Sequence, residues 1–546
     1  MADPTSGARP TRREQPLEAK QSPWSLPYKV TAVVLVLAAF VLLLRMYDQE
    51  IHGPAHEEIN IGDGIPATLY LPVDAPDDGE FPVPEPVGQR PPVIVMAHGY
   101  SADQASMSGL ARSLARAGYA VVSIDLRGHG SNTHPFRGDL KDDISAAVDW
   151  ATASPYVDGN RLAVLGHSMG AGAVLDFGTV DPRPKAVIPV SGGSELNDSH
   201  VPTNTLFLVA SGDPGEIGDR QALLAEQLSA KELVDGGKPN VVRHEVSGRD
   251  HVTILRADDT VRQIVKFLDP VLEPAAASDR GGELPGMDDP RYETAGLYLI
   301  VVLGLVALLG LAVGQTVPDP MNAASARSNP SLLGFALPTA ALVVTMPLLT
   351  AGGFNVLPLG PGQQLVMHLA LAGGVLWGGR TLARRGQLGG QAGALLGEGQ
   401  WLPLRTAGWA GLASAGVIVA LVLPMAPVLH RMVPTPARAV FWVILSLAAL
   451  PFFAAFEALT RRGRGARATL AGIGGKVLLL AVTFVGASIG FLPFVLLLVL
   501  AFLIIQYVVM EVFNSTAFAR GRNTALIAVV DAILIGFLAV VFTPVG

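Results

Sequence analysis

The hydrophobic and polar positions divide the chain into regions of different character. Residues 1–28 are polar and have no hydrophobic period, which predicts a disordered cytoplasmic tail. A short apolar run follows, and residues 46–278 then alternate short apolar strands with helical segments. A linker rich in Pro, Gly and acidic residues occupies 279–293, and long apolar runs fill 294–546. The pattern predicts a soluble domain between an anchor helix and a membrane domain.

The first apolar run extends from Val30 to Leu44 and is interrupted only by Thr31. Lys29 and Arg45 bound it, so residues 29–45 are predicted to form a transmembrane anchor helix. A cleaved signal peptide is the alternative. No small-x-small cleavage site follows in the sequence LRMYDQEIHG, which favours a retained anchor. Both alternatives export the domain that follows.

The segment 46–278 predicts an α/β fold with a doubly wound, mostly parallel sheet. Its strands are nearly continuous apolar runs, which is typical of strands covered by helices on both faces. Expected strands are Ala67 to Val73, Pro92 to His98, Ala120 to Leu126, Arg161 to His167, Lys185 to Ser191 and Thr205 to Ser211. Expected helices between them are Ala105 to Gly118, Leu140 to Ala153 and Asp219 to Leu233.

The segment 294–546 predicts an all-α membrane domain of about eight helices. Its apolar runs lie near 296–314, 331–351, 364–379, 406–423, 439–459, 474–487, 491–510 and 523–543. Gly490 and Pro493 separate the sixth run from the seventh, so that these two form either a tight hairpin or one kinked helix.

Positive charges between these runs give the orientation. With the amino terminus in the cytoplasm and the hairpin counted as two helices, the soluble domain and the carboxyl terminus lie outside. The predicted cytoplasmic loops then hold Arg327, Arg380, Arg384, Arg385, Arg405, Arg461, Arg462, Arg464, Arg467, Lys476, Arg520 and Arg522, whereas the outer loops hold Arg431 and Arg438.

Composition agrees with a protein partly in lipid. Half of the 546 residues are hydrophobic, 16% are charged, and the mean hydropathy is +0.41. Acidic residues outnumber basic ones between Val30 and Glu293, which disfavours nucleic acid as a partner. The chain has no cysteine, which excludes disulfides, thiolate metal sites and a cysteine nucleophile.

Gly166-His167-Ser168-Met169-Gly170 fits the pattern G-x-S-x-G. In a chain with 60 glycines such a spacing also arises by accident, but here it follows an apolar strand and opens a helix of small residues. That is the setting in which the motif holds a serine exposed on a strained turn. Ser168 is the candidate nucleophile.

From about His56 to Leu272 the chain resembles the α/β-hydrolases, in particular dienelactone-hydrolase-like and peptidase-like members. Besides GHSMG, the segment HGYSAD from His98 is similar to the family's oxyanion loop. The segment DLRGHGSN from Asp125 is similar to its D-x-R-G-H-G-x-S loop, with Asn132 in place of the last serine.

The resemblance implies an acid and then a histidine after the serine. Four histidines follow Ser168 in or near this domain, namely His200, His244, His251 and His368, and the polar turn around His251 makes it the preferred base. Asp213, which follows a strand as SGDP, is the preferred acid, with Glu216 and Asp219 as alternatives.

The resemblance also implies an oxyanion hole made by the backbone N–H groups of Tyr100 and Met169, whose side chains alternatively line an acyl pocket. His98 and His129 are expected to be structural. No phosphate loop or metal-ligand spacing is visible, so no cofactor or metal is predicted.

Two further features bear on function. About a dozen residues separate the strand ending at Ser191 from that beginning at Thr205, where many lipases of this fold insert a lid, so the membrane domain is the nearest candidate cover. Asp531 lies in a long apolar run, where it is either a functional residue or a partner in a helix–helix hydrogen bond. Glu457, near Arg461, is expected to form an interfacial pair.

The leading hypothesis is a membrane-embedded serine hydrolase that cleaves a carboxylic ester of a lipid or another apolar acyl substrate. A peptidase or amidase with the same triad is the second. The third is a transporter or sensor with a regulatory hydrolase-fold domain.

Overall fold

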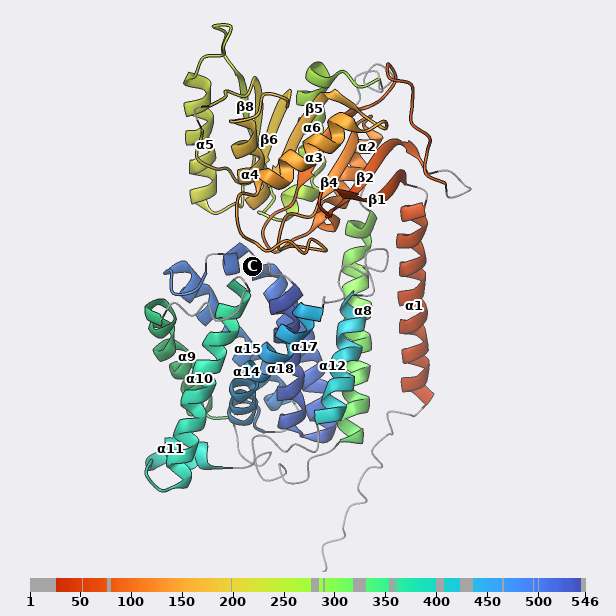
Figure 1. The fold of residues 1–546 in the computed structure, drawn as a ribbon. Coiled ribbons are helices and arrows are strands. Elements are labelled where there is room, and N and C mark those ends of the chain that lie inside the picture. Colours follow the sequence, from red (N-terminus) through yellow and green to blue (C-terminus); the bar gives the residue numbers. More distant parts are fainter. Residues whose placement is uncertain are drawn as a thin grey trace, which may run out of the picture.

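The computed structural model describes residues 26–51, 53–75, 80–197, 199–275, 284–287, 290–317, 330–352, 359, 361–398, 407–422, 436–463, 466–493, 495–498 and 500–541. An α/β domain lies against one end of a group of long helices (Figure 1). Most of the predicted tail, parts of the predicted linker, and Arg327, Arg405, Arg431 and Arg464 lie outside the described residues.

The α/β domain is built on a sheet of eight strands in the order β1-β2-β4-β3-β5-β6-β7-β8. The pairs β1–β2 and β2–β4 are antiparallel, and every other pair is parallel. The strands are β1 (Pro54–Ile61), β2 (Ile65–Asp74), β3 (Pro92–Ala97), β4 (Ala120–Ile124), β5 (Asp158–His167), β6 (Ala186–Val190), β7 (Asn204–Ala210) and β8 (Asn240–Val246).

Helices cover both faces of this sheet. One apolar core packs α2 (Ser108–Arg116) and α6 (Asp258–Leu272) on the first face. A second core packs α3 (Lys141–Ala153), α4 (Met169–Gly178) and α5 (Gly215–Ala230) on the other. The central strand β3 is buried along its whole length, which explains its uninterrupted apolar sequence. Short 3-10 turns, η1 (Gln104–Met107) and η2 (Thr253–Arg256), precede α2 and α6.

The fold class predicted from the sequence is confirmed, with one addition. Strand β1, which the apolar pattern does not reveal, forms the edge of the sheet beside β2. Its sequence PAHEEINI carries two glutamates, and its central residues are largely exposed. An edge strand with one solvent-exposed face needs no apolar run, so the sequence gives little indication of β1.

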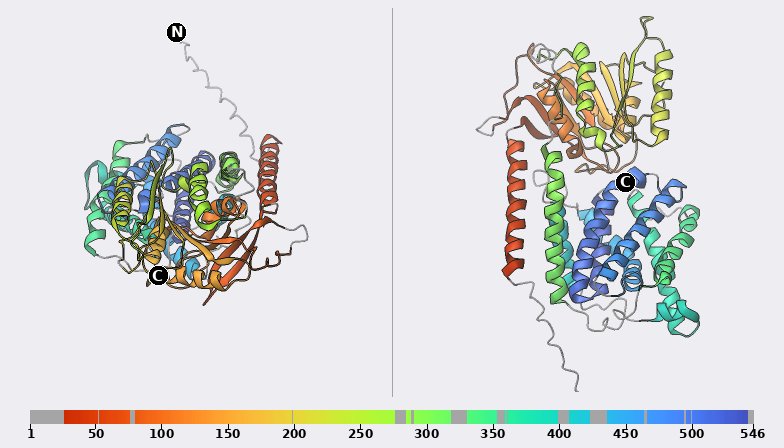
Figure 2. Two further views of the ribbon diagram at one scale, coloured as in Figure 1. Left: turned by 90° about the horizontal axis from the view of Figure 1, so that it is seen from above. Right: turned by 180° about the vertical axis from the view of Figure 1, so that it is seen from behind.

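The helical part contains α1 (Leu26–Ile51) and a carboxyl-terminal series. These helices are α8 (Pro290–Thr316), α9 (Leu332–Gly352), α10 (Pro361–Arg384), α11 (Gly390–Gly397), α12 (Ala407–Val422), α14 (Pro436–Thr460), α15 (Ala466–Ser488), α16 (Val495–Leu498), α17 (Leu500–Gly521) and α18 (Thr524–Val541). Two views show α1 standing beside α8 (Figures 1 and 2).

Seven helices of the described part are long and apolar enough to cross a membrane. Their spans are Gly296–Thr316, Leu332–Leu349, Gly362–Arg384, Pro436–Thr460, Ala466–Ser488, Leu500–Gly521 and Thr524–Val541, and Gly408–Leu421 is a shorter apolar helix. The region 474–510 forms separate helices, because the chain turns after Ser488 with Gly490 at φ +79°. The carboxyl-terminal region is thus a multi-helix part consistent with a membrane domain.

Helices α8 and α17 approach closely through small residues. A Cβ atom added at Gly310 or Gly314 of α8 would overlap the backbone of α17 near Phe513 or Ala517. Glycines four residues apart let two helix backbones come together, which is a common way to hold helices in lipid.

Several charges expected in loops are instead buried within helices. Lys476 lies inside α15, and Arg380 lies inside α10 and donates to the carbonyl of Leu396. Glu457 does pair with Arg461, and both side chains are fully buried in the protein. Burial of paired charges is invisible to a hydropathy pattern.

The carboxyl ends of the parallel strands face the helical part. The loops after β3 and β4 lie on the side of the α/β domain nearest the helices (Figure 1). Arg438, in the first turn of α14, donates to the carbonyl of Gly128 in the loop after β4 at 3.1 Å. It also donates to the carbonyls of Val540 and Val541 at the end of α18. Arg438 therefore joins the two parts of the chain.

Candidate active site

Ser168 occupies the sharp turn between β5 and α4. Its backbone has φ 53° and ψ −110°, a region that costs a non-glycine residue free energy and is found at functional sites. The side chain is half-buried at the carboxyl end of β5. The turn thereby presents the hydroxyl at the edge of the sheet that faces the helical part.

A chain of hydrogen bonds joins Ser168, His251 and Asp213. The Oγ of Ser168 lies 2.9 Å from Nε2 of His251, and Nδ1 of His251 lies 2.6 Å from Oδ1 of Asp213. The His251 and Asp213 side chains are 8% and 1% exposed, so these contacts are shielded from water. Donation by Nδ1–H to Asp213 leaves Nε2 free to accept the Ser168 proton.

Asp213 lies in the loop after β7 and is held by more than the histidine. Its Oδ2 accepts from the hydroxyl of Ser191 at 2.6 Å and from the N–H of Ala210 at 2.8 Å. Burial alone raises the pKa of Asp213, but the hydrogen bonds from His251 and Ser191 outweigh it and leave the pKa below its usual range. The carboxylate is therefore ionised at neutral pH.

His251 lies in the turn after β8 and is positioned by His167, the residue before Ser168. The Nε2–H of His167 donates to the backbone carbonyl of His251 at 2.7 Å. Burial and the neighbouring His251 lower the pKa of His167 to about 3, so His167 is neutral and can only support that turn by its single N–H. The residue before Ser168 thus also helps to position His251.

The loop after β3 passes directly beside Ser168. A Cβ atom added at Gly99 would lie 3.2 Å from the Cβ of Ser168. Within the described part of the chain, the N–H groups of Tyr100 and Met169 donate to no other protein group. Both are thus available to an oxygen atom bound next to Ser168.

The Tyr100 side chain closes one wall of this loop. Its ring makes edge contacts with His129 at 5.6 Å and Phe136 at 5.9 Å between centroids. Burial raises the pKa of the Tyr100 phenol, which therefore stays protonated. Burial is also the main cause that lowers the pKa of His129, to about 3, and keeps that ring neutral. These rings form an apolar wall on the side of Gly128 and Arg438.

The loop from Asp125 to Asn132 is fixed by its own polar groups. Arg127 pairs with Asp143 of α3 at 2.9 Å, and Nδ2 of Asn132 donates to the carbonyl of Asp125 at 2.8 Å. His98 accepts from the N–H of Leu126 at 3.0 Å. Asn132, which departs from the family pattern, therefore holds the loop together.

The other candidates lie away from Ser168. His244 pairs with Asp259 on the surface at 2.7 Å, and His368 donates to the carbonyl of Leu342 within the helical part. Glu216 and Asp219 are exposed on α5. Ser191 and His167 are the contributors that sequence reasoning missed. His167 adjoins the motif serine, but nothing in the pattern indicates its contact with a residue 84 positions away.

No group of three or more His, Cys, Asp or Glu side chains among the described residues could hold a metal ion. The polar groups of the site are instead a hydroxyl, an imidazole, a carboxylate and two backbone N–H donors. Such a set can move a proton from the hydroxyl to the imidazole while the N–H donors receive negative charge on a bound oxygen.

The sheet order and the turn at Ser168 give the amino-terminal part of this chain the fold of an α/β-hydrolase domain. Residues 88–211 match the family model described as serine aminopeptidase, S33. This match includes the loop after β3, the turn at Ser168 and strand β7.

The chain is similar to two curated proteins over part of its length. The chain is 32% identical over 152 residues to the bis(hydroxyethyl) terephthalate hydrolase of Streptomyces coelicolor, covering 27% of this chain and 44% of that protein. It is 32% identical over 128 residues to cutinase 2 of Thermobifida cellulosilytica, covering 22% of this chain and 47% of that protein. The chain thus spans less than half the length of these two relatives.

Among solved structures, an esterase from the archaeon Pyrobaculum calidifontis has a TM-score of 0.32 and 17% identity, covering 45% of this chain and 94% of that chain.

Proposed function

We propose that this chain is a membrane-embedded serine hydrolase that cleaves carboxylic esters of lipids or other apolar acyl compounds. The observation that carries the proposal is the hydrogen-bonded chain from Asp213 through His251 to Ser168, at a sheet edge that faces apolar helices. The two esterase relatives add support for the bond that is cleaved.

In the proposed reaction, Ser168 Oγ attacks the ester carbonyl while His251 Nε2 takes its proton. The carbonyl oxygen becomes an oxyanion that accepts from the N–H groups of Tyr100 and Met169. Collapse expels the alcohol, which receives the proton from His251, and leaves an acyl group on Ser168. Water, deprotonated by His251, then releases the carboxylic acid and restores the serine.

The apolar substrate class is inferred from the surroundings of the site. Between β6 and β7, residues 191–203 contain no helix or strand in the described part that could form a separate lid. The loop that carries Gly128 is instead held to α14 and α18 by Arg438. A substrate that reaches Ser168 between the two parts would come from the side of the apolar helices.

The full-length protein in lipid nanodiscs tests this proposal. We expect long-chain esters presented in the bilayer to be hydrolysed faster than short water-soluble esters, and Ser168→Ala to abolish both activities. Equal activity of wild type and Ser168→Ala would refute the catalytic assignment. Faster hydrolysis of the soluble esters would refute entry from the membrane side.

A peptidase or amidase is the second candidate, favoured by the description of the matching family model. The same three side chains serve both reactions, so geometry does not separate them. Esters and amides with identical acyl groups distinguish the two candidates. Our proposal requires a clear preference for the ester, and a preference for amides with a free amino terminus would select the peptidase.

We also propose that the amino terminus is cytoplasmic and the α/β-hydrolase domain extracytoplasmic. The chain has no cysteine, so single introduced cysteines can report the sides. Val234 is fully exposed on the hydrolase domain, and Gln387 is exposed after α10. In intact cells an impermeant maleimide should label Val234→Cys and should label Gln387→Cys only after lysis. The opposite pattern would invert the topology.

A further inference from the structure

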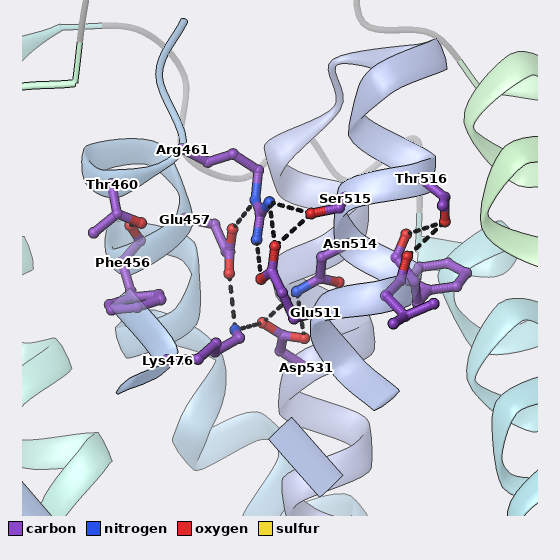
Figure 3. Close-up of polar contacts among 12 residues, drawn as sticks. Phe456, Glu457, Thr460, Arg461, Lys476, Glu511, Asn514, Ser515, Thr516 and Asp531 are labelled. Carbon is purple, nitrogen blue, oxygen red and sulfur yellow. Dashed lines mark hydrogen bonds and ion pairs between the residues drawn. The ribbon is translucent and has the colours of Figure 1, made fainter. Parts of the chain in front are cut away.

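A buried polar cluster lies among α14, α15, α17 and α18, far in sequence from the hydrolase site (Figure 3). It contains Glu457, Arg461, Lys476, Glu511 and Asp531, whose residues are 0%, 1%, 3%, 7% and 0% exposed. Ionised groups are costly inside an apolar helix bundle unless their charges are matched. The charges of this cluster must therefore be matched within it.

Arg461 satisfies the two glutamates. Its Nε donates to Oε2 of Glu457 at 2.6 Å, and its Nη1 and Nη2 donate to the two oxygens of Glu511 at 3.0 and 2.6 Å. Gly472 of α15 provides the space, because a Cβ atom there would lie 2.5 Å from the Arg461 guanidinium nitrogens. One guanidinium thus serves two carboxylates.

Lys476 divides its charge between two carboxylates. Its Nζ donates to Oε1 of Glu457 at 2.9 Å and to Oδ2 of Asp531 at 2.5 Å. The rings of Phe453 and Phe456 lie 5.3 and 5.1 Å from Nζ, where their faces favour a cation. These surroundings keep Lys476 charged.

Three carboxylates and two cations leave one negative charge unmatched, and Asp531 is the group with the least compensation. Besides a share of Lys476, its only other partner among the described residues is the neutral Asn514, whose Nδ2 donates to both carboxylate oxygens at 2.9 and 3.0 Å. The Oδ1 of Asn514 is buried and has no hydrogen-bond partner in the described structure. The amide group next to Asp531 thus has an acceptor without a donor.

Other titratable groups on the described helices around Asp531 do not supply the missing positive charge. Tyr507 of α17 is a neutral phenol that interacts electrostatically with both Lys476 and Asp531. Of the other helices that pack on α18, α12 carries no titratable residue, and on α10 the side chains of His368 and Arg380 are directed to backbone carbonyls of Leu342 and Leu396.

We propose that Asp531 is a proton-binding site of the membrane domain and holds an exchangeable proton. The proton adds to a carboxylate oxygen of Asp531, which brings the net charge of the cluster from minus one to zero. After rotation of the Asn514 amide, the new O–H donates to its Oδ1, and this bond replaces the bonds from Nδ2. Lys476 remains an ammonium group paired with Glu457.

A proton fits this site better than a metal ion. The Nζ of Lys476 already occupies the position between Glu457 and Asp531 where a metal would bind. No metal-binding group of three acidic or histidine side chains is present among the described residues. A proton needs no space and no further ligand, and it leaves the ion pairs of Arg461 intact.

Infrared spectroscopy of the full-length protein in nanodiscs tests the site directly, because a carboxylic acid and a carboxylate absorb at different frequencies. Spectra are recorded from neutral to alkaline pH. We expect the wild type to show the band of one buried carboxylic acid at neutral pH, lost on alkalinisation. Asp531→Asn should lack this band, and Asp259→Asn, which changes a surface carboxylate of the hydrolase domain, should retain it.

If the wild type and Asp531→Asn have the same carboxylic acid absorption across this pH range, the proposal is overturned, since Asp531 would then be ionised throughout. If Asp531→Asn does not fold, as judged by gel filtration and circular dichroism, Asp531→Glu replaces it. The carboxylic acid band should then move in frequency, and an unmoved band would equally overturn the assignment. Neither result depends on hydrolase activity.

Discussion

Replacing Asp213 by asparagine tests the hydrogen-bonded chain at its buried end. Asparagine has the same shape, so its amide oxygen can take the place of Oδ2 of Asp213 and keep the contacts with Ser191 and Ala210. The amide nitrogen then faces Nδ1 of His251, where the carboxylate oxygen stood at 2.6 Å. Two donors cannot share that contact, so His251 must place its proton on Nε2. That nitrogen can no longer accept the proton of Ser168.

The size of the effect follows from this change of tautomer. In a serine-protease triad it lowers kcat about 10⁴-fold, which corresponds to about 5.5 kcal/mol of transition-state stabilisation. We expect a loss of that order for Asp213→Asn in kcat with little change in KM. Asparagine also removes the negative charge of residue 213. An imidazolium at His251 then has no buried counter-charge, which lowers kcat further.

The assay is hydrolysis of a chromogenic ester by the full-length protein in nanodiscs. Glu216→Gln is the matched control, since Glu216 follows the same strand but is exposed on α5, and we expect near wild-type rates for it. A folded Asp213→Asn variant that keeps more than about a tenth of wild-type kcat would refute this reasoning. The orienting acid would then be another residue.

Three further results are expected. Arg438→Met should slow hydrolysis of bilayer-embedded esters about tenfold and leave soluble esters nearly unaffected. A factor of about ten corresponds to the loss of one charge-assisted hydrogen bond to the hydrolase loop. Parallel losses on both substrates would contradict a role of Arg438 in joining the two parts. Burial lowers the pKa of His167 and of His129 to about 3 in the folded protein, against about 6.5 in the unfolded chain. Acidification below about pH 6.5 therefore protonates the unfolded chain first. The free energy of unfolding then falls by up to roughly 1.4 kcal/mol per histidine and pH unit. His167→Gln should therefore show a smaller fall in Tm from about pH 7 to pH 5 than the wild type, and equal falls would contradict the buried neutral state. Gly314→Val should lower the Tm of the helical part because its side chain meets the backbone of α17, whereas Gly374→Val, in open space on α10, should not; equal effects would refute the close packing of α8.

The sequence predicts the centre of the sheet well because strands buried on both faces are written as uninterrupted apolar runs. Strand β3 is an example, whereas β1, with an exposed face and two glutamates, is not revealed by the same criterion. Ser168 can be identified because its turn imposes a local motif. His251 and Asp213 required the family's order of residues, and their roles remain predictions. The contribution of Ser191 depends on a contact 22 residues along the chain and has no local pattern.

The buried charge pairs of the helical part could not be predicted from the hydropathy pattern. The positive-inside rule assigns Lys476 to a cytoplasmic loop, whereas the structure places it inside α15. Its partner Asp531 lies 55 residues away, and the pair becomes visible only when α15 and α18 are brought together. A hydropathy pattern treats each residue by itself, so it cannot detect charges that compensate one another across helices.

The most direct test of the central claim is covalent labelling of the full-length protein with a fluorophosphonate, followed by mass spectrometry of the labelled peptide. Such a probe reacts with a serine whose hydroxyl is activated by a neighbouring base. We expect one adduct, on Ser168, that is absent from Ser168→Ala and strongly reduced in His251→Ala. An adduct on another serine, or equal labelling of wild type and Ser168→Ala, would contradict the account.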